Sequence, residues 1–165
     1  MKTLYLVRHA KSSWKFPELS DHDRPLNKRG KRDAPAMGKR LVLRGVKVDA
    51  MISSSANRAY TTAQVIAGEI GYPITDIMPN SELFHADPAT IRDVTQQLNE
   101  NTQTAMLFGH NPGFTWAANQ LANLQIDNIP TCGIVAISFP IDSWTEVEFG
   151  KGELVFYDYP KKVNL

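Results

Sequence analysis

Short apolar runs with strand character alternate with segments of helical spacing along most of this chain. The predicted strands lie at 4–7, 46–52, 74–78, 104–108 and 134–139, and the predicted helices lie at 28–44, 56–70, 89–99 and 114–124. Strands that are separated by helices pair in parallel, and the helices then cover both faces of the sheet. We therefore predict an α/β protein, a three-layer α/β/α sandwich whose central sheet is mostly parallel.

The last part of the chain breaks this alternation. Apolar runs at 134–139, 144–149 and 154–159 follow one another at short spacing, and Gly150-Lys151-Gly152 joins the last two. Such spacing is typical of antiparallel strands linked by tight turns. We therefore expect an antiparallel element at the end of the sheet. Elsewhere, Pro35 lies inside the predicted helix at 28–44, so we expect a kink or a late start in that helix.

Composition and charge argue against several classes of protein. The chain has 165 residues, 42% of them hydrophobic and 21% charged, and a net charge of +1. These values indicate one domain over 1–165 and give no reason to expect binding to nucleic acid or to a membrane. Because Cys132 is the only cysteine, no intramolecular disulfide can form, and we expect a structural thiol in a reducing compartment. With no targeting segment in sight, we expect a cytoplasmic monomer.

The first predicted strand ends abruptly in a cation and an imidazole. Leu4–Val7 is followed directly by Arg8 and His9, and then by Ser12 and Ser13. In open α/β sheets, the carboxyl ends of the strands form the edge at which ligands bind. Guanidinium, imidazole and backbone N–H groups together suit a phosphoryl dianion. Taken alone, this stretch does not separate a packed histidine from a catalytic one.

Two other predicted strands end in a similar way. One runs into Ser53-Ser54-Ser55 and then Arg58, and another runs into Gly109-His110-Asn111-Pro112. In a parallel sheet all three ends lie at one edge, so these residues should meet there. Histidines and arginines without a cluster of cysteines or carboxylates do not resemble a metal site. We therefore predict a phosphoryl-transfer site with no metal and no cofactor.

Four segments together resemble the signature blocks of the histidine phosphatase superfamily, and closely those of its small SixA-type phosphohistidine phosphatase branch. These segments lie at 6–10, 23–30, 53–63 and 108–112. Ala10 stands where the family usually has glycine, and the effect of this difference is open. The resemblance spans Leu4 to Pro112, in the family's order. It implies the phosphoglycerate mutase-like form of the α/β sandwich.

The resemblance also implies a role for each site residue. His9 would attack phosphorus as a neutral imidazole and form a phosphohistidine intermediate, which water would then hydrolyse. Neighbouring guanidinium groups disfavour the imidazolium form and would keep the lone pair of His9 available. The phosphate-binding residues would be Arg8, Arg24, Arg58 and His110, with Ser12 and Asn111 as further donors.

The proton donor is less clearly marked than the nucleophile. Family members that act on alkyl phosphate esters carry an acid in the loop after the third strand, and Glu82 lies in the corresponding region. A solvated or helix-capping carboxylate is an equal alternative for Glu82. A phosphorylated imidazole is an easier leaving group and needs less help. For His22 and His85 we expect exposed loop positions without a role.

Three hypotheses about function follow. The first is a metal-independent phosphatase acting on phosphorylated histidine in a protein, favoured because the longest candidate insertion, 79–88, is too short to cap the site. The second is a small-molecule phosphomonoesterase with Glu82 as the proton donor. The third is a non-catalytic phosphate-binding module, although simple binding would not need both His9 and His110 beside the arginines.

Overall fold

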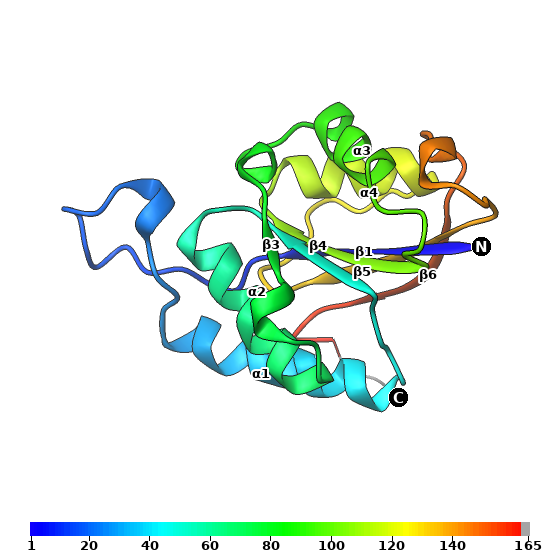
Figure 1. Cartoon of the computed structure of the whole chain (residues 1–165). Coiled ribbons are helices and arrows are strands. Elements are labelled where there is room, and N and C mark those ends of the chain that lie inside the picture. The colour runs from blue at the N-terminus through cyan, green and yellow to red at the C-terminus, as the bar shows by residue number, and fades with distance from the viewer. Residues whose placement is uncertain (163–165) are drawn as a thin grey trace.

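The computed structural model describes residues 1–162 and has one six-stranded sheet between two layers of helices (Figure 1). The strands are β1 (Lys2–Arg8), β2 (Ala50–Ser53), β3 (Met78–Pro79), β4 (Thr104–Gly109), β5 (Ile134–Phe139) and β6 (Glu153–Asp158). The α-helices are α1 (Lys28–Leu43), α2 (Asn57–Ile70), α3 (Pro88–Gln96) and α4 (Gly113–Ala122). Short 3-10 helices are η1 (Asp21–Asp23), η2 (Ile74–Asp76), η3 (Ser81–Leu83) and η4 (Trp144–Glu146).

The sheet is parallel on one side and antiparallel on the other. Its strand order is β3-β2-β4-β1-β5-β6. The neighbours β3, β2, β4 and β1 pair in parallel, whereas β5 runs antiparallel to β1, and β6 antiparallel to β5. This arrangement confirms the predicted fold class, a mostly parallel α/β/α sandwich with an antiparallel element at its end.

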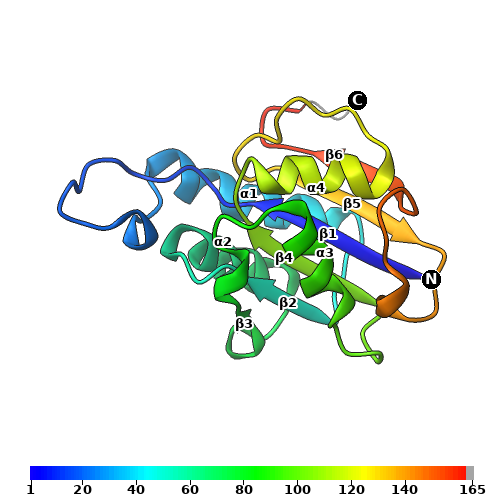
Figure 2. The same cartoon turned by 90° about the horizontal axis from the view of Figure 1, so that it is seen from above.

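The two helical layers explain why the strands are apolar throughout. Helices α1 and α2 cover one face of the sheet, and α3 and α4 cover the other (Figure 1 and Figure 2). Along β1, Leu4 and Leu6 point into the core beneath α3 and α4, while Tyr5 and Val7 point into the core beneath α1 and α2. Successive side chains face opposite sides of a strand, so a strand buried on both faces needs a continuous apolar run.

The predicted strand at 144–149 is wrong. Residues Trp144–Glu146 form η4, and the Ser143 side chain caps its start together with Glu146. The Trp144 ring is fully buried, and its indole N–H donates a 2.8 Å hydrogen bond to the carbonyl oxygen of Thr102. The aromatic residue that suggested a strand therefore anchors a loop on the core.

Other boundaries also differ from those predicted. In place of the strand at 74–78, Ile74–Asp76 form η2 and only Met78–Pro79 pair with the sheet. The strand predicted at 46–52 pairs only from Ala50. Pro35 lies inside a helix that runs continuously from Lys28, so the expected late start does not occur. A proline there removes one N–H donor, and the packed remainder of α1 tolerates the loss.

No helix within residues 1–162 has the length and apolar character needed to cross a membrane.

Candidate active site

Parallel pairing brings the ends of β1, β2 and β4 together. The backbone N–H of His9 donates to the carbonyl oxygen of Gly109 at 3.0 Å. The N–H of Ser54 donates to the carbonyl oxygen of Phe108 at 2.9 Å. These bonds continue the sheet pairing for one residue beyond the strands. As a result His9, Ser54 and His110 are neighbours although they lie far apart in the sequence.

A cavity of about 300 Å³ opens at this edge of the sheet. All the predicted site residues except Glu82 line it, namely Arg8, His9, Ser12, Arg24, Arg58, His110 and Asn111. Residues that were not predicted complete the lining, namely Lys11, Trp14, Asp21, His85 and Thr131. The structure thus collects cationic and imidazole side chains from separate segments around one hollow.

His9 is held in one tautomer by its own backbone. Its ring is only 7% exposed, and Nδ1 lies 2.7 Å from the carbonyl oxygen of Ala10. Because a carbonyl only accepts, Nδ1 carries the proton and Nε2 keeps its lone pair. Burial, together with the charges of Arg58, Arg8 and Arg24, lowers the pKa of His9 to about 3 against the opposing effect of the Ala10 hydrogen bond. The imidazole is therefore neutral at physiological pH.

The arginines of the cavity come from three different elements. Arg8 ends β1 and donates to the carbonyl oxygen of Ile129 at 2.9 Å. Arg24 follows η1 and donates to Ser12 Oγ at 2.7 Å and to Asp21 Oδ1 at 3.0 Å. Arg58 lies in the first turn of α2, is 2% exposed, and donates to Asp21 Oδ2 at 3.1 Å. Each guanidinium is thus anchored at some of its N–H groups.

Several buried donors of this cavity have no partner. Within residues 1–162, Arg8 Nε, Arg58 Nε and His110 Nδ1 are buried nitrogen atoms that make no hydrogen bond. Other unpartnered atoms, those of Arg29, Asp33 and Asp158, face an opposite charge at 3.6 Å. A buried donor without a partner carries an energetic cost, and such groups persist where a ligand satisfies them. The unpaired donors gather where an anion would bind.

His110 is oriented by a serine. Its Nε2 lies 2.8 Å from Ser54 Oγ, and that oxygen also accepts from the Ala56 N–H at 3.2 Å. With the serine oxygen accepting from Ala56, the hydroxyl proton is free to go to Nε2, which leaves the proton of the ring on Nδ1. Burial, with the neighbouring His9 and Arg58, lowers the pKa of His110 to about 2. His110 is therefore a neutral donor whose ring centroid lies 5.2 Å from that of His9.

Ser12 and Asn111, the two further donors expected at the site, differ in whether they still have a hydrogen-bond donor to offer. Ser12 is 6% exposed and accepts from Arg24, so its own hydroxyl proton is still available. The Asn111 amide nitrogen donates to Asn128 Oδ1 and to the Ile129 carbonyl, both at 2.9 Å. The Asn111 side-chain oxygen accepts from Thr115. Asn111 therefore holds the wall of the cavity together with groups that are already paired.

Glu82 does not reach the cavity. It lies on η3, is exposed, and is not among the lining residues. Its backbone N–H donates to Asn80 Oδ1 at 2.9 Å, which caps η3. Its neighbours along the chain turn inwards instead: the Phe84 ring lies against His110, and His85 lines the cavity.

Asp21 and His85 are the residues that the sequence reasoning missed. Asp21 accepts from Arg24, from Arg58 and, at 3.1 Å, from His85 Nε2. Burial alone would raise the pKa of Asp21, but the hydrogen bond from His85 and the two arginines lower it to about 2. His85 is exposed as expected, yet it lines the cavity. Asp21 lies in the short helix η1 and His85 in a loop, neither of them in a periodic pattern, and only the fold brings them together.

Ala10 fits its position without requiring glycine. The residue is fully buried with its side chain in the core beneath α1 and α2, and its N–H donates to Thr62 Oγ1 at 3.0 Å. Cys132 is also fully buried, and its N–H donates to the carbonyl oxygens of Arg8 and His9. Burial raises the pKa of the Cys132 thiol. Both residues therefore support the end of β1.

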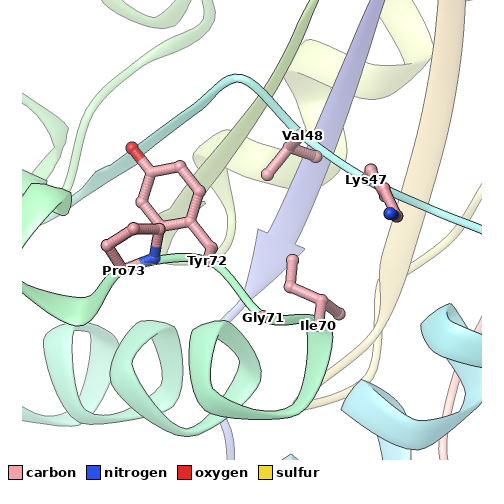
Figure 3. Close-up of a pocket in the computed structure, with 6 residues that line it drawn as sticks. All are labelled: Lys47, Val48, Ile70, Gly71, Tyr72 and Pro73. Carbon is pink, nitrogen blue, oxygen red and sulfur yellow. The ribbon is translucent and has the colours of Figure 1, made fainter.

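The rest of the described chain offers no comparable cluster. A second hollow of about 380 Å³, drawn in Figure 3, lies beside the end of α2 and is lined by Val48, Ile70, Gly71, Tyr72 and Pro73 with Lys47. It contains neither histidine nor arginine. Within residues 1–162, no three histidine, cysteine or acidic side chains are grouped so as to hold a metal ion.

Comparison with known proteins relates this chain to a family. Residues 4–83 match the model of the histidine phosphatase superfamily, branch 1. An uncharacterized protein of Mycobacterium tuberculosis is 30% identical over 94% of this chain and 100% of its own length.

Solved structures agree with this match. A candidate SixA phosphohistidine phosphatase from Agrobacterium tumefaciens has 25% identity and a TM-score of 0.82, over 96% of this chain and 98% of its own. A protein histidine phosphatase SixA in complex with tungstate has 19% identity and a TM-score of 0.81, over 96% and 97% of the two chains, and shows the same fold. The chain is therefore a phosphatase that belongs to the histidine phosphatase superfamily.

Proposed function

We propose that this protein removes phosphoryl groups without a metal ion, through a phosphohistidine formed on His9, and that its substrate is phosphorylated histidine in a protein. The observation that carries the proposal is the state of His9. Its Nδ1 is bound to the Ala10 carbonyl, its pKa is about 3, and its Nε2 makes no hydrogen bond within residues 1–162. A buried, neutral imidazole with one free lone pair beside three guanidinium groups suits attack on phosphorus.

The reaction proceeds in two displacements. In the first, the Nε2 lone pair of His9 forms a bond to phosphorus, while the bond to the leaving atom breaks and its electron pair stays on that atom. In the second, a water oxygen forms a bond to phosphorus, the bond to Nε2 breaks, and the electron pair returns to His9. The proton lost by the water leaves with a base or with the product phosphate.

The arginines and His110 stabilise charge on the phosphoryl oxygens. Arg8 Nε, Arg58 Nε and His110 Nδ1 are buried donors without partners, so an incoming phosphoryl group replaces missing hydrogen bonds instead of competing with existing ones. Guanidinium groups bind such oxygens through planar, often bidentate contacts. Because these donors are fixed before the substrate binds, they stabilise the transition state without reorganisation.

The shape of the surroundings supports a protein substrate. The segment between β1 and α1 projects beyond the sheet and helices (Figure 1). It carries the exposed side chains of Trp14, Phe16 and Leu19, and Trp14 itself lines the cavity. An open cavity beside exposed apolar side chains suits a phosphorylated side chain on the surface of another protein better than an enclosed metabolite.

A small phosphomonoester is the alternative substrate. Its alkoxide is a poor leaving group and needs a proton donor. Glu82 was proposed for that task, but it faces solvent outside the cavity. The alternative with Glu82 as the acid therefore lacks the contact that it needs.

The test is turnover of a phosphohistidine protein and of an aryl phosphate, each with and without a chelator. We expect wild type to hydrolyse both substrates at rates that the chelator does not change, and His9→Ala to be inactive on both. Full activity of His9→Ala, or loss of wild-type activity on chelation, would contradict the mechanism. Inactivity of the folded wild type on every phosphate offered would favour the non-catalytic binding module instead.

A further inference from the structure

His85 lines the same cavity as His9 and has a solvent-exposed side chain. We propose that His85, held by Asp21, donates the proton to the leaving group, in the role that the sequence suggested for Glu82. The inference rests on the proposed phosphatase reaction and adds the acid that this reaction lacks. It is carried by where His85 lies, by its partner and by the absence of Glu82 from the cavity lining.

The backbone holds His85 towards the cavity. Its φ angle is 54°, in the left-handed region that side chains with a Cβ seldom adopt. Strain of this kind is found where surrounding contacts impose it and where function uses it. The next residue, Ala86, packs so closely on α4 that a Cβ at Gly113 would overlap its carbonyl oxygen. The His85 ring lies 4.1 Å from the Phe84 ring and 5.2 Å from the His110 ring, centroid to centroid.

Asp21 gives His85 a fixed orientation and a balancing charge. Nε2 of His85 donates to Asp21 Oδ2 at 3.1 Å, so the other ring nitrogen, Nδ1, is the one that can exchange a proton. Nδ1 makes no hydrogen bond to residues 1–162. Since the pKa of Asp21 is about 2, its carboxylate is ionised at neutral pH and balances a protonated ring. A carboxylate–imidazole pair of this kind is a familiar way to orient an acid–base group.

The other groups near His85 either bind Asp21 or carry no charge. Arg24 and Arg58 both donate hydrogen bonds to the Asp21 carboxylate, and this negative charge offsets their repulsion of the His85 ring. On the opposite side His85 faces His110, whose pKa of about 2 keeps it neutral. The ring of Phe84 completes the contacts and carries no charge.

The proposed proton transfers balance over the two displacements. As His9 takes the phosphoryl group, the leaving atom keeps the electron pair of the broken bond and takes the proton from His85 Nδ1, which becomes neutral. As water attacks the phosphohistidine, the same Nδ1 takes a proton from that water, and His85 returns to its protonated state. No further reactant is required. A phosphohistidine substrate uses the same donor, because its imidazole leaves as a neutral ring once protonated.

A purely positioning role is the competing explanation, because His85 also helps to fix Asp21 and, through it, Arg24 and Arg58. The two roles differ in their dependence on the leaving group. Loss of a proton donor slows substrates with poor leaving groups most, whereas loss of a positioning contact slows all substrates alike.

The experiment compares His85→Gln with wild type on aryl phosphates whose leaving groups range from a nitrophenol to an unsubstituted phenol, and on an alkyl phosphate. Glutamine can still donate to Asp21 but cannot act as an acid. For His85→Gln we expect kcat/KM to be close to wild type on the nitrophenyl ester and to fall about 100-fold or more on the poorest leaving group. Glu82→Gln is the matched control and should follow wild type on every ester.

His85→Ala provides a second measurement that does not depend on how glutamine packs. Added imidazole should restore activity of His85→Ala on the poor leaving groups and leave the nitrophenyl ester unchanged. An equal loss on all esters, no loss, or the graded loss in Glu82→Gln instead, would overturn the assignment to His85. These outcomes leave the His9 phosphoenzyme in place, whereas a wild type that forms no phosphoenzyme fails at the proposed function itself.

Discussion

The cavity has an inner wall and a rim, and they differ most in their access to water. The inner wall consists of Arg8, His9, Arg58 and His110, and the rim consists of Trp14, Asp21 and His85. On the inner wall Arg58 is 2% exposed, His110 3% and His9 7%. On the rim Trp14 is 73% exposed, and the side chains of His85 and Asp21 are 54% and 44% exposed.

This difference separates two tasks within one site. Residues of the inner wall follow directly on strands or open a helix, and their buried, partly unpaired donors match a phosphoryl group. On the rim, Asp21 lies in η1 while Trp14 and His85 lie in loops, and all three meet solvent, where the rest of a substrate has to be. We therefore propose that the inner wall carries out phosphoryl transfer and that the rim selects the leaving group and the partner.

We expect the largest fall in activity when a residue of the inner wall is substituted. Arg58→Lys keeps the positive charge but loses the planar fork and the paired contacts with Asp21. We expect kcat/KM to fall about 100- to 1,000-fold on every phosphate, as for removal of a fixed transition-state donor. Steady-state kinetics on two substrates measure this fall. Arg32→Lys, exposed on α1 and outside the cavity lining, is the control, and a similar loss in both variants would contradict the distinction.

The second-largest effect that we expect is a loss of folding stability at acid pH, caused by the buried His9. His9 has a pKa of about 3 in the folded protein and about 6.5 when unfolded, so the unfolded chain binds more protons between these values. Folding stability is therefore lost as the pH falls through this window, by about 2 kcal/mol at pH 5 for this one histidine. His9→Asn should reduce the difference between urea midpoints at pH 7 and pH 5. An unchanged difference would show that His9 is not held neutral by burial.

The smallest effect is expected at the rim. Trp14 stacks on Arg24, with the guanidinium carbon 3.6 Å from the ring centroid, and is otherwise exposed. An exposed side chain at the edge of an interface usually contributes less than about 1 kcal/mol, so Trp14→Ala should raise KM for a phosphohistidine protein about two- to five-fold and change KM for an aryl phosphate less. Trp116→Ala, exposed on α4 and outside the lining, is the matched control. An equal change in KM for both substrates would contradict a role of Trp14 in recognising the partner protein.

The inner wall could be predicted from the sequence, and the rim could not. Arg8 ends β1, and His9 and His110 directly follow β1 and β4, so their position at one sheet edge follows from parallel pairing alone. Asp21 and His85 lie 64 residues apart and meet only through the conformation of η1 and of the loop around His85, which has no period to detect in the sequence. The position of Glu82 along the chain predicts a proton donor, but His85, three residues further on, is the residue that lines the cavity.

Errors in the fold have a similar origin. The run at 144–149 has the aromatic and branched residues of a strand, but Trp144 is buried by a hydrogen-bonded loop instead of a ladder. At 74–78 the sequence contains strand formers, yet it lies at the sheet edge, where only Met78 and Pro79 pair. At 144–149, burial without pairing looks like a strand in the sequence, because side-chain pattern reports burial and not the backbone partner.

The central claim is that His9 receives the phosphoryl group on the nitrogen that its own backbone leaves free. The most direct measurement is to trap the phosphoenzyme by rapid quench at alkaline pH and to identify the phosphorylated nitrogen by ³¹P and ¹H NMR of the derived peptide. Because Nδ1 is bound to the Ala10 carbonyl at 2.7 Å, we expect phosphorus on Nε2 of His9. Phosphorus on Nδ1, on another residue, or on no residue during turnover would contradict the account.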